Sequence, residues 1–288
     1  MSLSFGVAQI LNALALASLI TILASGLALI FGLRGAMNFA HGALYMLGAY
    51  LGYSAGRSLG FWPALVFVPI VMALAGAALE ISVLRPFQGR TPVDMALITL
   101  GVGWIMEPAV YYWWGTAPLS VDPPPSLAGS VPILGTMYPA YRLFLTGVGF
   151  GTCIALALWL KNTTSGMHTR AVSHQAHISR MMGVNTDRLS MLVACLGTAF
   201  AGFAGVLAGP YLSVDPGMGS TILITCLIVV VVGGLGSIGG AIVASVVYGF
   251  IQVIGAVFFP SAAVLAPYLL LIAVLIWRPQ GFGRGRVT

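Results

Sequence analysis

Long apolar segments separated by short polar ones dominate this chain, and its first 33 residues carry no charged side chain. A helix that crosses a bilayer needs about 20 predominantly apolar residues. The pattern therefore predicts an all-α, polytopic membrane protein with about eight or nine transmembrane helices. The expected spans are residues 7–33, 38–55, 61–84, 94–114, 141–160, 189–210, 221–232, 238–259 and 264–277.

Three parts of the chain carry further structural expectations. Segment 221–232 is short for a full crossing, so we expect it to be a partial or re-entrant element. Residues 115–139 are rich in Pro, Gly and Ser and are expected to form an extracytoplasmic loop. The N-terminus has no basic region before its apolar run, which favours an uncleaved first span over a signal peptide.

Composition excludes a soluble protein. The chain is 59% hydrophobic and only 6% charged, whereas soluble domains carry roughly 25% charged residues. Its three cysteines all lie inside apolar runs, so they are expected to be buried, small apolar side chains. Their spacing supports neither a metal site nor a disulfide framework.

The distribution of basic residues predicts an orientation. With nine crossings, an outside N-terminus and a cytosolic C-terminus, ten of the twelve basic residues fall in cytosolic loops, as basic residues flanking membrane spans usually do. The two outside are Arg57 and Arg142. The ten are Arg34, Arg85, Arg90, Lys161, Arg170, Arg180, Arg188, Arg278, Arg284 and Arg286. They form no continuous basic stripe, so nucleic-acid binding is not expected.

Residues 161–190 form the one long charged segment, with three of the four histidines of the chain. Within it, residues 169–182 are expected to form a short helix that ends with Gly183 at the C′ position. Asn185 then offers a cap to the next span. A short helix held between two membrane helices can transmit force to both, although an ordinary cytosolic loop fits the residues equally well.

The histidines of that segment are His168, His174 and His177. A metal site there is conceivable, but it would have no Cys or carboxylate ligand nearby. Solvated or interface histidines are the favoured interpretation.

The stretch GLRGAMNFAHGALYMLG, residues 32–48, places Asn38 and His41 at the start of an apolar helix. At a spacing of three the pair is expected to share a helix face, and Gly35 and Gly42 permit a break in the helix. Polar groups at membrane depth are costly unless they line a cavity or find a partner. One interpretation is a discontinuous helix beside a substrate path. The other, equally favoured, is that Asn38 caps the helix and His41 bonds a backbone carbonyl.

Glu107 is the acidic residue placed deepest in a predicted span. A charge at the bilayer centre costs roughly 2.5–3.5 kcal/mol on insertion scales, so this carboxylate should face a bundle interior or water. It could contact a substrate ammonium or relay protons, but an interior carboxylate with a structural partner is somewhat favoured. Glu80 is expected to pair with Arg85, and Asp94 and Asp215 to cap helices.

Several enzyme classes are excluded by missing motifs. Gly234, Gly236 and Gly239 match the spacing of a dinucleotide-binding turn, but no acidic residue follows Asp215 to hold a ribose. A glycine-rich turn between membrane helices fits better. The chain has no Walker A motif and no clustered catalytic set, so any ATP hydrolysis must occur on another subunit, and no cofactor is expected.

The combined motifs resemble the permease subunits of branched-chain amino acid ABC importers, the LivH type. The similar stretches are residues 26–52, with the NFAHG motif, then 79–86, 96–102, 170–189, with MMGVNTDR, and 230–245. The resemblance implies that residues 1–288 form a single transmembrane permease domain, all helical and broken near 35–42, in a bacterial-type inner membrane. Residues 161–190 would be its cytosolic coupling loop.

The resemblance also implies partners and roles for residues. The partners would be a second permease of the LivM type, two ATP-binding subunits and an extracytoplasmic substrate-binding protein. Residues 170–185 would contain the coupling helix that sits on an ATPase, and 233–240 a second broken region. The coupling residues would be Arg170, Ala171, Arg180, Gly183 and Asn185, and those beside the path Asn38, His41, Gly42, Gly236 and Ser237, with Glu107 as a further candidate.

The coupling segment departs from the family pattern at Thr169, His174, Gln175, His177 and Ser179. Such a basic, histidine-containing segment favours an acidic groove on its ATPase. The expected function is ATP-driven import of branched-chain or related aliphatic amino acids. The alternatives are the same class of importer carrying urea, amides or aromatic acids, an ion-coupled secondary transporter that uses Glu107 and His41 as a proton relay, and an intramembrane enzyme. Pairing with itself or with a sister permease is left open.

Overall fold

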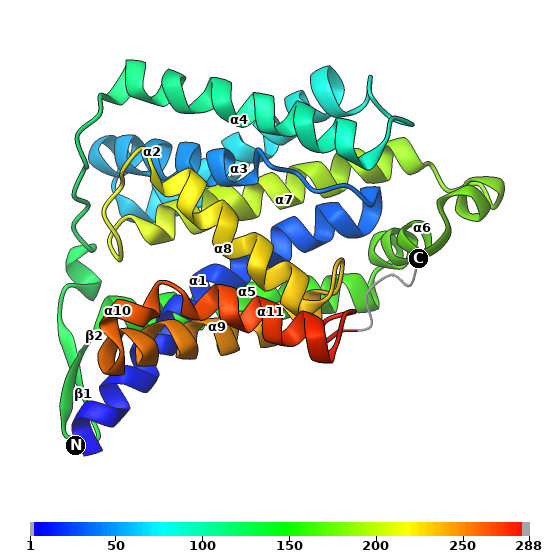
Figure 1. Cartoon of the computed structure of the whole chain (residues 1–288). Helices are drawn as coiled ribbons and strands as arrows, with labels where there is room; N and C mark the ends of the chain where they lie inside the picture. Colours follow the sequence, from blue (N-terminus) through cyan, green and yellow to red (C-terminus); the bar gives the residue numbers. More distant parts are fainter. Residues whose placement is uncertain (1–2, 284–288) are drawn as a thin grey trace.

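The structure is a computed structural model that describes residues 3–283 (Figure 1). Its α-helices are α1 Leu3–Arg34, α2 His41–Leu59, α3 Phe61–Leu79, α4 Pro92–Trp114, α5 Ala140–Asn162, α6 Thr164–Met181, α7 Thr186–Ala208, α8 Met218–Gly233, α9 Ile238–Phe258, α10 Pro260–Ala263 and α11 Ala266–Trp277. A π-helical turn, Glu80–Leu84, continues α3, and a 3-10 turn, Pro125–Leu127, precedes strands β1 Ser130–Ile133 and β2 Thr136–Pro139. Arg284 and Arg286, which the orientation argument uses, lie outside the described residues.

The prediction of an all-α membrane protein is confirmed in its coarse form. Within residues 3–283, six helices are long and apolar enough to cross a membrane: α1, α3 with its π turn, α4, α5, α7 and α9. That number is below the predicted eight or nine. The reason is that α8 and α11 are apolar but have only 16 and 12 residues, and α2 includes polar and charged side chains along its 19 residues.

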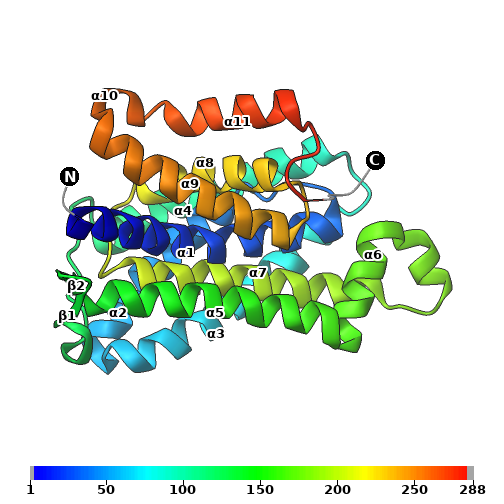
Figure 2. The same cartoon turned by 90° about the horizontal axis from the view of Figure 1, so that it is seen from below.

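Helix α1 forms the centre of the bundle, with α5, α7, α8 and α9 packed around it (Figures 1 and 2). Of its most apolar stretch, 83% is buried, against only 17% for α4. Helix α4 instead covers one side of the bundle and exposes large apolar side chains such as Ile105 and Trp113. A face of this kind is stable only against lipid or another protein.

Close approaches of glycine hold α2 against its neighbours. Gly48 faces the backbone of Gly202 on α7, and Gly42 faces the carbonyl of Gly219 on α8. A Cβ added to Gly42 would also lie 2.8 Å from the Cβ of Leu223, closer than real Cβ atoms approach. Small residues let membrane helices approach each other in this way and gain van der Waals contact.

The bundle has two different ends. Helix α6 projects from one end, which we call the α6 end, and the antiparallel hairpin β1–β2 lies at the other, the hairpin end (Figures 1 and 2). The hairpin turns through Leu134 and Gly135, both with positive φ (46° and 82°), as a tight two-residue turn requires. The sequence predicted only an irregular loop here, since leucine is an unusual residue at such a turn position.

Candidate functional site

The interruption predicted near residues 35–42 is present and places the start of α2 deep in the bundle. Helix α1 ends at Arg34, residues 35–40 are not helical, and α2 begins at His41. The Nε2 atom of His41 lies 3.0 Å from the carbonyl oxygen of Leu23. Leu23 lies eleven residues before the end of α1, which corresponds to about 16 Å along the helix. The chain therefore returns into the bundle before α2 starts.

Most of the polar groups at this break are bonded to the protein itself, although the buried Nδ1 of His41 has no partner among the described residues. The Oδ1 atom of Asn38 accepts a hydrogen bond from the Ala40 amide at 3.1 Å, and the Phe39 amide donates to Thr99 Oγ1 of α4 at 3.0 Å. Asn38 and His41 are 4% and 1% exposed. The two do not share a helix face, because Asn38 lies outside the helix. In this conformation their contacts are those of the structural alternative, with Asn38 forming a turn before α2 and His41 meeting a backbone carbonyl.

Glu107 lies beside the break across a small cavity of about 50 Å³ between α2, α4 and α8. Phe39 and Ala43 line this cavity from the start of α2, and Ser220 lines it from the start of α8. One Glu107 oxygen, Oε1, accepts a hydrogen bond from Tyr111 Oη at 3.1 Å. The fold thus brings Glu107 together with the break and with Gly42, whose backbone contacts α8. Sequence reasoning missed Ser220, since nothing in its neighbourhood distinguishes it from other helix-start serines.

Gly236 and Ser237 do not join this group. They lie in the turn between α8 and α9, where Gly236 has a φ of 80° and packs against Gly32 of α1. Gly32 lies about 14 Å along α1 from Leu23, toward the α6 end. Ser237 caps α9 by accepting a hydrogen bond from the Gly240 amide at 3.1 Å. This turn and the Glu107 cavity are therefore at different depths of the bundle.

The predicted short helix of the charged segment is α6. It starts at Thr164, five residues earlier than predicted, because Thr163 caps it by accepting from the Gly166 amide at 3.0 Å. Gly183 follows its end with a φ of 85°, and the Val184 amide donates to the Ser179 carbonyl, so the predicted glycine stop is confirmed. Asn185 caps α7 through the Arg188 amide, as predicted.

Helix α6 is bent and largely uncovered. Gln175 has non-helical backbone angles (φ −146°, ψ 83°), which divide α6 into two shorter helices. The predicted coupling residues are all exposed: Arg170, Ala171, Arg180, Gly183 and Asn185. Large apolar side chains on the second half are exposed too, with Met181 at 76% and Met182 at 79%.

The three histidines of α6 are exposed, as expected for solvated or interface groups. Within the described residues, no group of three His, Cys, Asp or Glu side chains is arranged to hold a metal ion.

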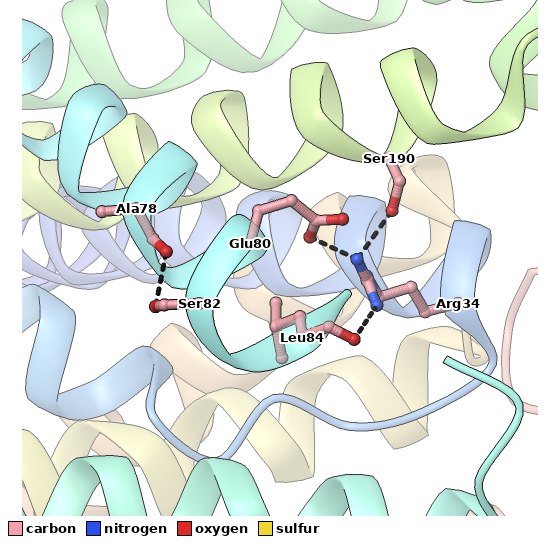
Figure 3. A network of polar contacts seen from close by, with 6 residues as sticks. All are labelled: Arg34, Ala78, Glu80, Ser82, Leu84 and Ser190. Carbon is pink, nitrogen blue, oxygen red and sulfur yellow. Dashed lines mark hydrogen bonds and ion pairs between the residues drawn. The ribbon is translucent and has the colours of Figure 1, made fainter. Parts of the chain in front are cut away.

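A buried polar network ties the end of α1 to two other helices (Figure 3). Arg34 forms an ion pair with Glu80, and the same terminal nitrogen donates to Ser190 Oγ of α7 at 2.7 Å. Its other terminal nitrogen lies 3.5 Å from the Leu84 carbonyl. The Glu80 side chain is 0% exposed, so without Arg34 it would be a buried, unpaired charge.

This network corrects the expected pairing of Glu80 with Arg85, because the ion pair of Glu80 within the described residues is with Arg34, whereas Arg85 is exposed. The sequence does indicate that Arg34 needs a partner. It is the first charge after an uncharged run, and a charge at the end of a span needs a partner or water. The identity of its partner depends on how α1 and α3 meet, which sequence spacing does not reveal.

Comparison with known proteins agrees with this architecture. The family model described as "Branched-chain amino acid transport system / permease component" matches residues 9–276. The permease protein BraD of Pseudomonas aeruginosa, from a high-affinity branched-chain amino acid transport system, is 28% identical over 296 residues, covering 97% of this chain and 96% of BraD. LivH of Escherichia coli K12 is 26% identical, covering 97% and 96%.

Two further similarities are more distant. LivM of Salmonella typhimurium is 27% identical, over 90% of this chain and 66% of LivM. A solved structure of PsaBC from Streptococcus pneumoniae in complex with Fab aligns with 92% of this chain and 89% of its own, at 16% identity and a TM-score of 0.48. That structural likeness is too low to bear on the argument.

The family match spans almost the whole chain and includes the break, the Glu107 cavity and α6. It confirms the resemblance drawn from the NFAHG and MMGVNTDR stretches, and it identifies a multi-pass transport subunit, not an enzyme. The chain belongs to the family of branched-chain amino acid transport system permease components.

Proposed function

We propose that this chain is the membrane-spanning subunit of an ATP-driven importer for branched-chain or related aliphatic amino acids. The observation that carries the proposal is the full-length similarity to BraD and LivH, whose names give this transport role. The chain has no Walker A motif, so the energy must come from separate ATP-binding subunits. An extracytoplasmic binding protein would supply the substrate.

The proposed orientation places the α6 end in the cytosol. Arg34, Arg90 and Arg180 line one cavity at this end, in agreement with the usual excess of basic residues on the cytosolic side. The hairpin end would face outward. Nine crossings would then require α2, α8 and α11 to complete the bundle together with the six longer helices.

The proposed second permease is of the LivM type. This chain is similar to both LivH and LivM proteins, and that similarity supports a pseudo-symmetric pair of the two kinds. The exposed apolar face of α4 supports the proposal, since it needs lipid or protein to cover it.

The proposed substrate path passes the break and Glu107. Its cavity has one carboxylate and apolar walls that include Met46 and Leu223, groups that match an ammonium and an aliphatic side chain in chemistry. At about 50 Å³ the cavity would have to widen to admit an amino acid. Asn38, His41 and Gly42 would act by holding or releasing the start of α2 while the path opens. Gly236 and Ser237 would lie farther along, toward the cytosolic exit.

The proposed coupling element is α6. Its exposed residues Arg170, Ala171, Arg180, Gly183 and Asn185 would contact an ATPase, with Met181 and Met182 supplying apolar contact. Because α6 leads directly into α7, movement of the ATPase would reach the bundle through that helix.

Reconstitution of the assembled importer in liposomes tests the proposal. We expect leucine or valine uptake that requires ATP, the ATP-binding subunits and the loaded binding protein. Glu107→Gln should lower the uptake rate with little change in assembly, whereas Asp122→Asn, in an exposed loop, should leave it unchanged. Uptake driven by an ion gradient without the ATP-binding subunits would refute the importer function. Equal rates for Glu107→Gln and the unmodified protein would refute the role of that carboxylate.

A further inference from the structure

A cavity of about 200 Å³ lies at the α6 end, between the segment that joins α3 to α4 and the second half of α6. We propose that it is a binding site for a phosphate-class anion, either the headgroup of an acidic lipid or a free phosphate compound. The site would sit at the joint between α6 and the bundle. Its lining includes Arg34, Gln88, Arg90, Arg180 and the first turn of α7.

Two arginines that line the cavity have N–H groups that are not used in hydrogen bonds with the described residues. The side chain of Arg90 makes no hydrogen bond or ion pair with the residues that the structure describes. In the part of the chain that the structure describes, Arg180 bonds through its Nε alone, which donates to Thr186 Oγ1 at 2.8 Å, so both of its terminal amino groups are available. An unpaired guanidinium presents planar pairs of donors that match two oxygens of a phosphate group.

The charges around the cavity favour an anion. Arg34 is already neutralised by Glu80. Among the described residues of the lining, Arg90 and Arg180 then face a single carboxylate, that of Asp187, which leaves these residues with a net positive charge. Gln88 adds an amide donor at the same opening.

The position of the cavity connects it with both lipid and α6. Phe87 lines it and is 38% exposed, and Val93, just beyond it on α4, is 66% exposed, so the opening adjoins an apolar surface suited to acyl chains. Basic pockets beside membrane helices on the cytoplasmic side commonly hold acidic lipid headgroups. On the other wall are Val172 and Ala176, which flank the bend of α6 at Gln175.

An anion held by Arg90 and Arg180 together would therefore join the α3–α4 segment to the second half of α6. It would hold that half against the bundle, and α6 would move with α7 and the end of α1. The effect on coupling rests on the proposed function, whereas binding of the anion does not.

Binding is tested on the purified, assembled protein in nanodiscs of phosphatidylcholine with or without phosphatidylglycerol. Native mass spectrometry counts retained phosphatidylglycerol, and inorganic phosphate is added to the arm without phosphatidylglycerol. Loss of one charge-assisted contact should weaken retention about tenfold in Arg90→Gln. The matched control is Arg85→Gln, an exposed arginine of the same segment that does not line the cavity. Arg180→Gln should match Arg90→Gln in the binding readout, and Arg188→Gln should match the control.

Each outcome decides the proposal. Retention of phosphatidylglycerol that falls with Arg90→Gln but not with Arg85→Gln supports a lipid headgroup. Binding of inorganic phosphate with the same dependence, and no selective lipid retention, supports a free phosphate compound. Equal losses in Arg85→Gln and Arg90→Gln, or no binding of either probe, overturn the site. The ATPase activity of the assembled importer is measured on the same variants. If Arg90→Gln weakens binding but leaves that activity unchanged, the site stands and only its effect on coupling is refuted.

Discussion

The break between α1 and α2 and the helix α6 use similar residues in opposite environments. At the break, Asn38 and His41 are almost completely buried. Asn38 Oδ1 and His41 Nε2 bond to the backbone, while His41 Nδ1 has no hydrogen-bond partner among the described residues. On α6, His174 and His177 are exposed, together with Met182. The residue types alone do not separate the two regions. The number of neighbouring helices does, because the start of α2 is in contact with α1, α4 and α8.

The difference determines how each region can act. A buried polar group that leaves its partner loses a hydrogen bond in a medium that offers no replacement, so the break resists change until an opening admits water or substrate. An exposed apolar surface has no such barrier, and covering it with a partner lowers the free energy. Under the proposed function, the break would hold the path closed and α6 would receive a partner.

The largest loss of stability is expected when the Arg34 ion pair is removed. This pair anchors the end of α1 just before the break. Arg34→Ala should lower the free energy of unfolding by about 3–5 kcal/mol, because it leaves the fully buried Glu80 carboxylate without its counter-charge. Arg85→Ala, at the partner expected from sequence spacing, should change it by less than about 0.5 kcal/mol. Unfolding in mixed micelles, followed by circular dichroism, measures both. Equal losses of unfolding free energy in the two variants would show that Glu80 depends on Arg85 as much as on Arg34.

The next effect concerns the close approach of α2 to α8. Gly42→Ala should cost about 3 kcal/mol, since the added Cβ meets the backbone oxygen of Gly219, which cannot move independently of its helix. Gly56→Ala, on the same helix with open space around it, should be neutral or stabilising by up to about 1 kcal/mol. The same unfolding assay compares them. A well-tolerated Gly42→Ala would mean that α2 and α8 separate readily, and that the break is less tightly enclosed than this contact indicates.

A smaller loss of stability is expected when the hydrogen bond at the start of α2 is removed. His41→Leu should lower the free energy of unfolding by about 1 kcal/mol. The carbonyl oxygen of Leu23 would lose the hydrogen bond from His41, while the apolar surroundings would accommodate the leucine side chain. His174→Leu on α6 should have no measurable effect on unfolding, since that side chain is exposed. If His41→Leu leaves both stability and uptake rate unchanged, the bond contributes nothing to holding the path closed.

What the sequence predicted well was local. The end of α6 at Gly183 and the cap of α7 at Asn185 follow from residues within a few positions of each other, so short-range rules suffice. The apolar runs likewise predicted the helices with errors of a few residues. The partner of Glu80 was missed because it lies 46 positions away and depends on how α1 meets α3. The separation of Gly236 from Glu107 is also a property of depth in the bundle, which a glycine motif does not encode.

The smallest effect on stability is expected on α6, where function should nevertheless change most. Replacing Met181 and Met182 by Asp should alter the free energy of unfolding by less than about 0.5 kcal/mol, because both side chains are already exposed. If an ATPase covers them, burying two carboxylates against it should abolish co-purification of the ATP-binding subunit. Met167→Asp is the control. Met167 is 52% exposed on the first half of α6, before the bend at Gln175, and should keep the subunit bound. Loss of binding in Met167→Asp alone would move the docking surface to the first half of α6, and retention in every variant would show that α6 carries no apolar docking contact.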